Sequence, residues 1–280
     1  MQKNCDLHMH SIFSDGSDSP SILIDIALRE ELLGIALTDH NTVAGLYEFT
    51  EYAKGKNIVA VPGTELTTGY NGEEVHMVAL FVKPEHYESV MGLVKKYNGY
   101  RLENNRLLVN NLSNDGFDLD WDAIISSSPT GEINRLHIAK ALVSRGYAPS
   151  VSAAFDTILS PGGKYYRAPK RLDTLEAIDF IRSIGALPIM AHPFLSFGEK
   201  EMREFLPIAK EHGLVGFETR YSLYSPETDA LASRLAKEFD LLESGGSDYH
   251  GSGKPDIRIG HGKGGLEVPG RFLEDLMKLL

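Results

Sequence analysis

Short apolar runs alternate with amphipathic segments along most of the chain. The amphipathic segments have helical spacing; the first, residues 20–33, begins after a Ser-Pro capping signal at Ser19 and stops at Gly34. Asn41 and Thr42 are expected to cap the next helix. The apolar runs have the length of buried strands. They cover residues 5–9, 35–38, 58–61, 75–82, 186–190, 214–217 and 241–244. This alternation predicts an α/β barrel of seven strands rather than an open sheet.

Two features interrupt the alternation. Asn71 and Gly72 form a turn signal that returns the chain directly into the next strand. From about residue 99 to residue 166 the apolar spacing is helical throughout, with no convincing strand. We therefore expect a barrel domain formed by residues 1–98 and 167–280, and a helical insertion over 99–166 that covers the active site.

Composition narrows the class of protein. The chain has 280 residues, 42% of them hydrophobic, which is enough for one large core. It contains no apolar run of about 18 residues and no basic segment leading into an apolar one, so we expect a soluble, cytoplasmic protein without a membrane partner. The net charge of −11 disfavours long nucleic acid as a partner but permits a short anionic substrate. The single cysteine, Cys5, is expected to be a small buried strand residue.

Polar side chains follow the predicted strands. His8 and His10 share one face of the first strand, because residues two apart point to the same side, and Asp15 follows the next turn. Taken alone, such a pair is as often one core and one surface histidine. The carboxyl ends of barrel strands meet at one end of the barrel, however, so we expect these groups to converge with others. The full set is His8, His10, Asp15, His40, Glu65, His76, His192, Asp248 and His250.

The chemistry of this set points to metal ions. Nine nitrogen and oxygen ligands exceed the need of one ion, so the set predicts two or three divalent ions. The absence of thiolates argues against a structural zinc site. We expect manganese, with zinc or iron as alternatives.

Seven segments of the chain, in this order, resemble the motifs of the PHP domain family, named for polymerases and histidinol phosphatases. They are Asp6–Ser11, Ser14–Gly16, Thr38–His40, Pro62–Glu65, Val75–His76, Ala191–Pro193 and Gly246–His250. The resemblance implies a distorted (β/α)7 TIM-like barrel that carries a trinuclear metal site. It implies three groups of ligands: His8, His10 and Asp248 for one ion; Glu65, as a bridge, with His76 and His192 for a second; and Asp15, His40 and His250 for a third. A hydroxide that bridges the ions held by Glu65 and Asp248 would then attack a phosphoester.

Two segments of the insertion, 134–139 and 163–166, resemble those that contact the substrate phosphate in small stand-alone PHP phosphoesterases. The resemblance implies Arg135, His137 and Lys164 as phosphate contacts. For the arginine and the lysine, the alternative is a solvated helix face and a solvated loop.

Two further arginines are candidates for substrate binding. Arg101 falls near a position where these relatives carry a basic residue. Arg220 follows a strand end, where it either adds a phosphate contact or pairs with an acid such as Glu218 or Glu227.

The resemblance favours a metal-dependent phosphatase that acts on a small nucleotide, such as a nucleoside 3',5'-bisphosphate, or that trims very short oligonucleotides. Histidinol phosphate phosphatase is the alternative among phosphatases. Hydrolysis of an amide and a non-catalytic metal-binding module are alternatives of other classes. The sequence leaves open the leaving group, the general acid and the oligomeric state.

Overall fold

The computed structural model describes residues 3–128, 133–160, 162–165 and 170–280. Contacts divide the chain into two compact units, Met1–Met91 with Leu172–Leu280, and Gly92–Arg171. The predicted insertion lies within the second unit, and Tyr166, its predicted last residue, lies outside the described residues. No helix in the described residues is both long and apolar enough to cross a membrane.

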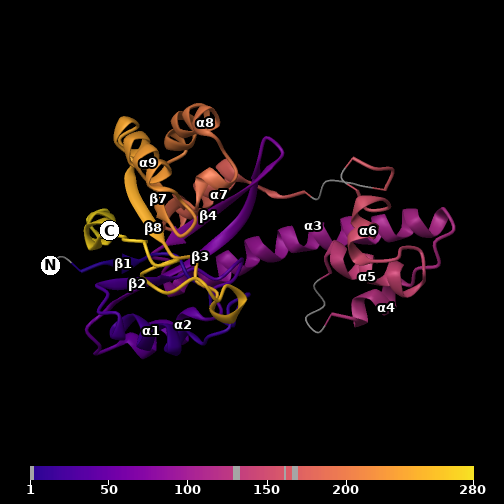
Figure 1. The fold of residues 1–280 in the computed structure, drawn as a ribbon, viewed down its shortest axis with the longest axis horizontal. Coiled ribbons are helices and arrows are strands. Elements are labelled where there is room, and N and C mark those ends of the chain that lie inside the picture. Colours follow the sequence, from indigo (N-terminus) through magenta and orange to yellow (C-terminus); the bar gives the residue numbers. More distant parts are fainter. Residues whose placement is uncertain (1–2, 129–132, 161, 166–169) are drawn as a thin grey trace. The chain divides into compact units, whose positions relative to one another are not determined.

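The first unit is built on one curved sheet (Figure 1). Its strands follow the order β1-β2-β3-β4-β6-β7-β8. Their bounds are Cys5–Asp6 (β1), Gly34–Leu37 (β2), Val59–Tyr70 (β3), Glu73–Leu80 (β4), Leu187–Met190 (β6), Gly216–Tyr221 (β7) and Leu242–Gly246 (β8). A short strand, β5 (Leu172–Asp173), pairs with β3 outside this path.

Backbone hydrogen bonds join the two ends of the sheet. The N–H of Leu7 donates to the carbonyl of Gly245 at 3.0 Å, and the N–H of Asp248 donates to that of His8 at 2.8 Å. A Cβ at Gly246 would lie 2.4 Å from the backbone nitrogen of His8, so only glycine permits this approach. The sheet is therefore a nearly closed barrel, which confirms the predicted fold class.

One strand runs against the rest. β4 is antiparallel to both β3 and β6, so the barrel is not fully parallel as the alternation suggested. The cause is the predicted turn, where Asn71 and Gly72 have φ of +50° and +91° and close a tight hairpin. As a result, the first residues of β4 lie at the end of the barrel where the parallel strands finish.

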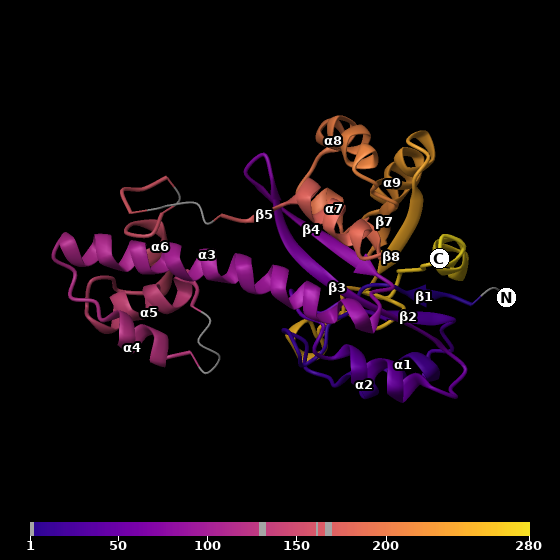
Figure 2. The ribbon, with the colours of Figure 1, turned by 180° about the vertical axis from the view of Figure 1, so that it is seen from behind.

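Helices cover the outside of the barrel. Their bounds are Pro20–Arg29 (α1), Leu46–Ala53 (α2), Thr174–Ser183 (α7), Glu199–Glu211 (α8), Pro226–Glu238 (α9) and Gly270–Met277 (α10). Figures 1 and 2 show α1 and α2 together on one side of the sheet and α7, α8 and α9 on the opposite side. Short 3-10 turns occupy Pro84–His86, Pro193–Leu195 and Gly251–Gly253.

One of the two predicted helix caps is confirmed. Ser19 caps α1 as predicted, accepting a hydrogen bond from the N–H of Ile22 at 3.4 Å. The predicted cap at Asn41 and Thr42 is wrong, because α2 begins only after Gly45. The side chain of Asn41 instead bonds β3, which ties the end of β2 to its neighbour.

The barrel core joins alternate strand residues to one face of α10. Cys5, Val61, Ile189 and Phe272 belong to it and are almost fully buried, so the cysteine is a core residue as expected. Burying one such side chain contributes about 1.5–3 kcal/mol. The interior below the strand ends is therefore apolar and closed.

The second unit is helical in its described residues, as the spacing predicted. Its helices are α3 (Tyr87–Asn114, which begins in the first unit), α4 (Trp121–Ser126), α5 (Arg135–Ser144) and α6 (Val151–Asp156). They share a separate core that includes Leu112, Ile138 and Leu142, against which Trp121 packs. The unit thus has its own hydrophobic centre.

Candidate metal centre

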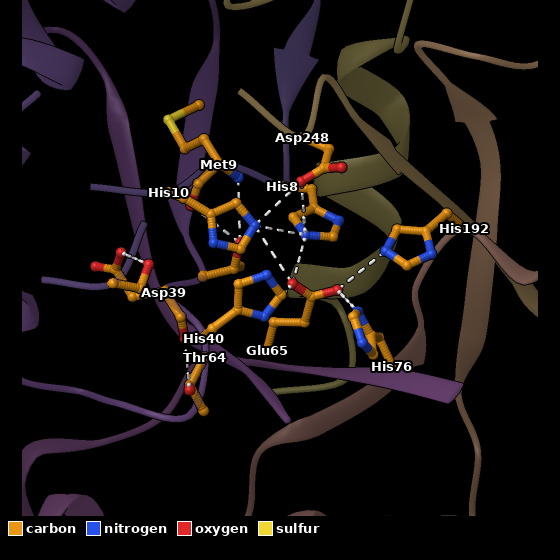
Figure 3. Close-up of polar contacts among 12 residues, drawn as sticks. His8, Met9, His10, Asp39, His40, Thr64, Glu65, His76, His192 and Asp248 are labelled. Carbon is orange, nitrogen blue, oxygen red and sulfur yellow. Dashed lines mark hydrogen bonds and ion pairs between the residues drawn. The ribbon is translucent and has the colours of Figure 1, made fainter. Parts of the chain in front are cut away.

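Each predicted ligand lies at the same end of the barrel. His8 and His10 follow β1, His40 follows β2, His192 follows β6, and Asp248 and His250 follow β8, while Glu65 and His76 lie in β3 and β4. The predicted ligands that follow β1 and β8 are buried, and so is Glu65. Asp15, in the loop after β1, is exposed. Figure 3 shows the imidazoles of His8, His10, His40, His76 and His192 gathered around the carboxylate of Glu65, with Asp248 beside them.

One oxygen of Glu65 faces a first group of nitrogen atoms. Its Oε2 lies 3.2 Å from His8 Nε2, 3.3 Å from His10 Nε2 and 3.0 Å from His40 Nδ1. Asp248 Oδ1 is 3.2 Å from His10 Nε2. Ligands about 2.0–2.2 Å from one ion are about 3.0–3.5 Å from one another, so these atoms are spaced for a shared ion.

The other oxygen of Glu65 faces a second group. Its Oε1 lies 2.8 Å from His76 Nδ1 and 3.0 Å from His192 Nε2. The carboxylate therefore has one oxygen directed to each group, which is the arrangement that a bridging ligand requires.

Asp15 marks a third group. Its Oδ1 lies 3.2 Å from His250 Nε2, and its Oδ2 lies 3.9 Å from His40 Nε2. The ligand atoms of Asp15, His40, His250 and also His10 lie within 4.8 Å of one another. The structure thus places His10 between this group and the first, whereas the resemblance assigned it to the first alone.

Several buried polar atoms of the cluster have no hydrogen-bond partner within the described residues. They are His10 Nδ1, His40 Nδ1 and Glu65 Oε2. Buried polar atoms are almost always paired, because an unpaired one costs about 1–3 kcal/mol. A cation among these atoms would satisfy them, so the donor set fits metal ions.

Electrostatics keep two of the predicted ligands, Glu65 and His10, in the forms that bind cations. Burial alone would raise the pKa of Glu65, but the imidazoles of His8 and His76 bring it well below its usual value. Burial lowers the pKa of His10 to about 4, so its ring is neutral near pH 7. A deprotonated carboxylate and a neutral imidazole are the states that coordinate metals.

Glu218, in β7, contacts two predicted ligands and does not stand out in the sequence as a site residue. It is buried, its Oε1 accepts a hydrogen bond from His8 Nδ1 at 2.8 Å, and its Oε2 accepts one from the backbone N–H of His192 at 2.6 Å. Burial opposes protonation of His8, yet Glu218 and Glu65 raise its pKa well above the usual value. Glu218 thus fixes the His8 ring with Nε2 toward the cluster. Its position at a strand end, shared with the other ligands, was the available signal.

Two other buried carboxylates shape the site. Asp39 accepts hydrogen bonds from Ser11 Oγ and Ser14 Oγ, both at 2.6 Å, and so holds the loop that carries Asp15. Asp6 accepts one from the backbone N–H of Ser247 at 2.8 Å, next to Asp248. These contacts order the segments from which the ligands project.

Two hydrogen bonds to the Oδ2 atom of Asp248 orient its side chain. Tyr221 Oη donates to Oδ2 at 2.8 Å, and Lys254 Nζ donates to the same oxygen at 2.6 Å. The sequence analysis singled out neither residue.

The four predicted substrate contacts of the second unit lie on α3, on α5 and in the loop after α6. Arg135 Nη1 donates to the carbonyl of Leu159 at 3.5 Å, and Lys164 forms an ion pair with Asp115. His137 contacts the Asn134 side chain at the start of α5. The substrate roles of these residues and of Arg101, on α3, stay predictions.

Arg220 is directed elsewhere. Its Nη1 donates to Ser233 Oγ on α9 at 2.8 Å, and its guanidinium lies 3.9 Å from both Asp229 and Glu243. The acids it meets differ from the Glu218 and Glu227 suggested by the sequence. The side chain is thus held against α9, and its substrate role stays a prediction.

Residues 6–178 match the family model described as the PHP domain. The chain belongs to the PHP domain family. This confirms the resemblance seen in the motifs.

Relatives extend over nearly the whole chain. A 5'-3' exoribonuclease of Haemophilus influenzae is 31% identical over 251 residues, 89% of this chain and 91% of the relative. A 3',5'-nucleoside bisphosphate phosphatase of Chromobacterium violaceum is 28% identical over 260 residues, 92% of this chain and 91% of the relative. A solved structure from Bifidobacterium adolescentis, assigned as a metal-dependent phosphoesterase, matches with a TM-score of 0.71 and 30% identity over 99% of this chain and 96% of that one. This PHP protein is a metal-dependent phosphoesterase, as predicted.

Proposed function

We propose that this PHP protein removes the phosphate group from a small phosphomonoester, a nucleoside 3',5'-bisphosphate or a similar nucleotide. The observation that carries the proposal is the convergence of imidazoles and carboxylates around Glu65, where three buried polar atoms have no hydrogen-bond partner in the described residues. The phosphatase relative, which spans 92% of this chain, supports the nucleotide class.

We infer that two or three divalent ions, with manganese expected, bind the nine ligands in the three groups described above. When bound, such ions lower the pKa of coordinated water toward about 7 and neutralise the phosphoryl oxygens. Glu65 and Asp248 remain ionised because the surrounding imidazoles lower their pKa values. Glu218 holds the His8 ring through Nδ1 with Nε2 toward the cluster, so the ring needs no reorientation before an ion binds.

Arg135, His137, Lys164 and Arg101 are proposed to contact the substrate. Arginine offers a planar pair of donors and lysine a point charge, and both suit phosphate. Replacing Arg135 by alanine should lower kcat/KM strongly and leave metal content unchanged. Arg145→Ala is the matched control, since its guanidinium pairs with Asp118 at 2.5 Å in the same unit.

A second candidate is removal of nucleotides from short RNA. The exoribonuclease relative, at 31% identity, supports this candidate, so a short nucleic acid remains a possible substrate. The net charge of −11 would still disfavour long polymers, because binding them requires basic surface.

The test is turnover by metal-reconstituted protein whose ion content has been measured, followed as phosphate release for the phosphomonoesters and by chromatography of the products for the other substrates. The panel contains adenosine 3',5'-bisphosphate, a 5'-phosphorylated trinucleotide, histidinol phosphate and a cyclic amide. We expect the bisphosphate to give the highest kcat/KM. Faster turnover of histidinol phosphate or of the amide would contradict the proposal, and no turnover at full metal content would indicate a structural module.

A further inference from the structure

A cavity of about 260 Å³ opens beside Asp248, on the side away from the imidazoles. The loops that follow β7 and β8 form it, so it belongs entirely to the barrel unit. Its lining includes Tyr221, Leu223, Asp248, Lys254, Ile257 and Lys263. None of the predicted phosphate contacts of the second unit contributes to the described lining.

We propose that this cavity is a subsite for a second anionic group of the substrate, a phosphate on the leaving group, which Lys254 and Lys263 bind. The inference rests on the proposed phosphatase function and specifies its substrate class. The metal cluster takes the phosphate that is cleaved, and the cavity takes the one that is retained.

Asp248 forms the wall between the two places. Its Oδ1 lies 3.2 Å from His10 Nε2 in the cluster, while its Oδ2 accepts hydrogen bonds from Tyr221 and Lys254 on the cavity side. A group in the cavity is therefore separated from the cluster by a single carboxylate.

Lys254 has capacity for an anion. Its ammonium is 2.6 Å from Asp248 Oδ2, and its side chain is 41% exposed. An ammonium has three N–H donors, so contacts remain for a phosphate after the bond to Asp248 is made.

Lys263 supplies a second ammonium group to the cavity. It is exposed and forms no ion pair within the described residues. The cavity is also lined by two carboxylates, Asp248, whose Oδ2 pairs with Lys254, and Asp256. The lining charges therefore balance, and Lys263 is the lining cation that has no ion pair in the described residues and can bind an anion.

The size of the cavity limits what enters. At about 260 Å³ it lies just below the roughly 300 Å³ at which pockets for drug-sized ligands begin. It can therefore hold a sugar phosphate rather than a whole nucleotide. Leu223 and Ile257 supply apolar surface for the carbon atoms of the sugar.

The test compares adenosine 3',5'-bisphosphate with adenosine 3'-monophosphate, in wild type and in Lys263→Ala. Lys254 is left intact because it also orients Asp248. Wild type should prefer the bisphosphate, and Lys263→Ala should lower kcat/KM for it about 10- to 100-fold, the effect of losing one charged hydrogen bond. Hydrolysis of the monophosphate should be unchanged. Lys263→Arg should restore most of the preference, and Lys200→Ala, on α8 and paired with Glu204 at 3.9 Å, is the control.

Equal losses on both substrates, or no loss on either, would overturn the subsite. A second measurement keeps the inference separate from the proposed function. Adenosine 5'-monophosphate carries only the retained phosphate, so its binding, measured by calorimetry, should weaken in Lys263→Ala whether or not any substrate is cleaved. If wild type cleaves neither nucleotide, the phosphatase proposal fails, and unchanged binding of the 5'-monophosphate would refute the subsite independently.

Discussion

Glu218 provides the sharpest test of how the metal centre is built. Its two oxygens each accept one hydrogen bond, from His8 Nδ1 at 2.8 Å and from His192 N at 2.6 Å. Glu218→Gln keeps the shape of the side chain but leaves one accepting oxygen. The new amide N–H₂ group then faces one of the two N–H donors.

The expected effect follows from these contacts. A hydrogen bond to a charged group contributes about 1.5–3 kcal/mol, and replacing a residue that orients a metal ligand typically weakens metal binding about 10- to 100-fold. Because both acceptors of Glu218 serve predicted ligands, we expect a loss of affinity in this range, equivalent to about 1.4–2.7 kcal/mol. Part of the loss will also appear as a lower stability of the metal-free protein.

The measurement is competition for Mn²⁺ or Zn²⁺ between folded protein and a chromophoric chelator. Glu243→Gln is the matched control, since Glu243 accepts from Thr219 Oγ1 at 2.8 Å and from Ser233 Oγ at 2.6 Å without contacting a ligand. The control should lose stability but not metal affinity. Folded Glu218→Gln protein that binds ions as tightly as wild type would refute the role assigned to this carboxylate. If Glu218→Gln does not fold, Glu218→Asp, which keeps both acceptors but shortens the side chain, takes its place.

Three further results are expected. Gly246→Ala should lower the free energy of unfolding by about 1–3 kcal/mol in denaturant titrations, because the added Cβ would lie 2.4 Å from the backbone nitrogen of His8. The control is Gly99→Ala on α3, where a Cβ meets open space, and it should raise the free energy of unfolding by about 0.5–1 kcal/mol. Equal effects of the two substitutions would contradict the close approach at Gly246. Burial raises the pKa of the Cys5 thiol and keeps it neutral, so it should react with a disulfide reagent at pH 8 only after unfolding; rapid reaction of the native protein would show an open core. Removing bound ions with a chelator should lower the melting temperature of the protein. Adding one ion back at about 100 times its dissociation constant should raise the free energy of unfolding by about 2.7 kcal/mol. An unchanged melting temperature would argue against ion binding at the cluster.

Much of the fold follows from local pattern. The helix beginning at Ser19 and the hairpin at Asn71 and Gly72 were predictable because capping and turn chemistry act over a few residues. The failed cap at Asn41 shows the limit of this reasoning. Its side chain could satisfy a helix end, but β3 lies within reach and takes its hydrogen bonds instead.

Most of the nine candidate ligands could be read from residue type and from position near strand ends, because the parallel strands of a barrel finish at the same end. Which atoms meet could not. His8 and Glu218 are 210 residues apart, and the register between β3 and β4, which sets His76 beside Glu65, depends on their pairing. The sequence by itself determined the family, the barrel and the chemistry of the metal centre. Tertiary structure alone decided the position of Glu65 between two groups of imidazoles, the orientation of the His8 ring and the cavity beside Asp248, because hydrogen bonds and cavities depend on distances between segments that only folding brings together.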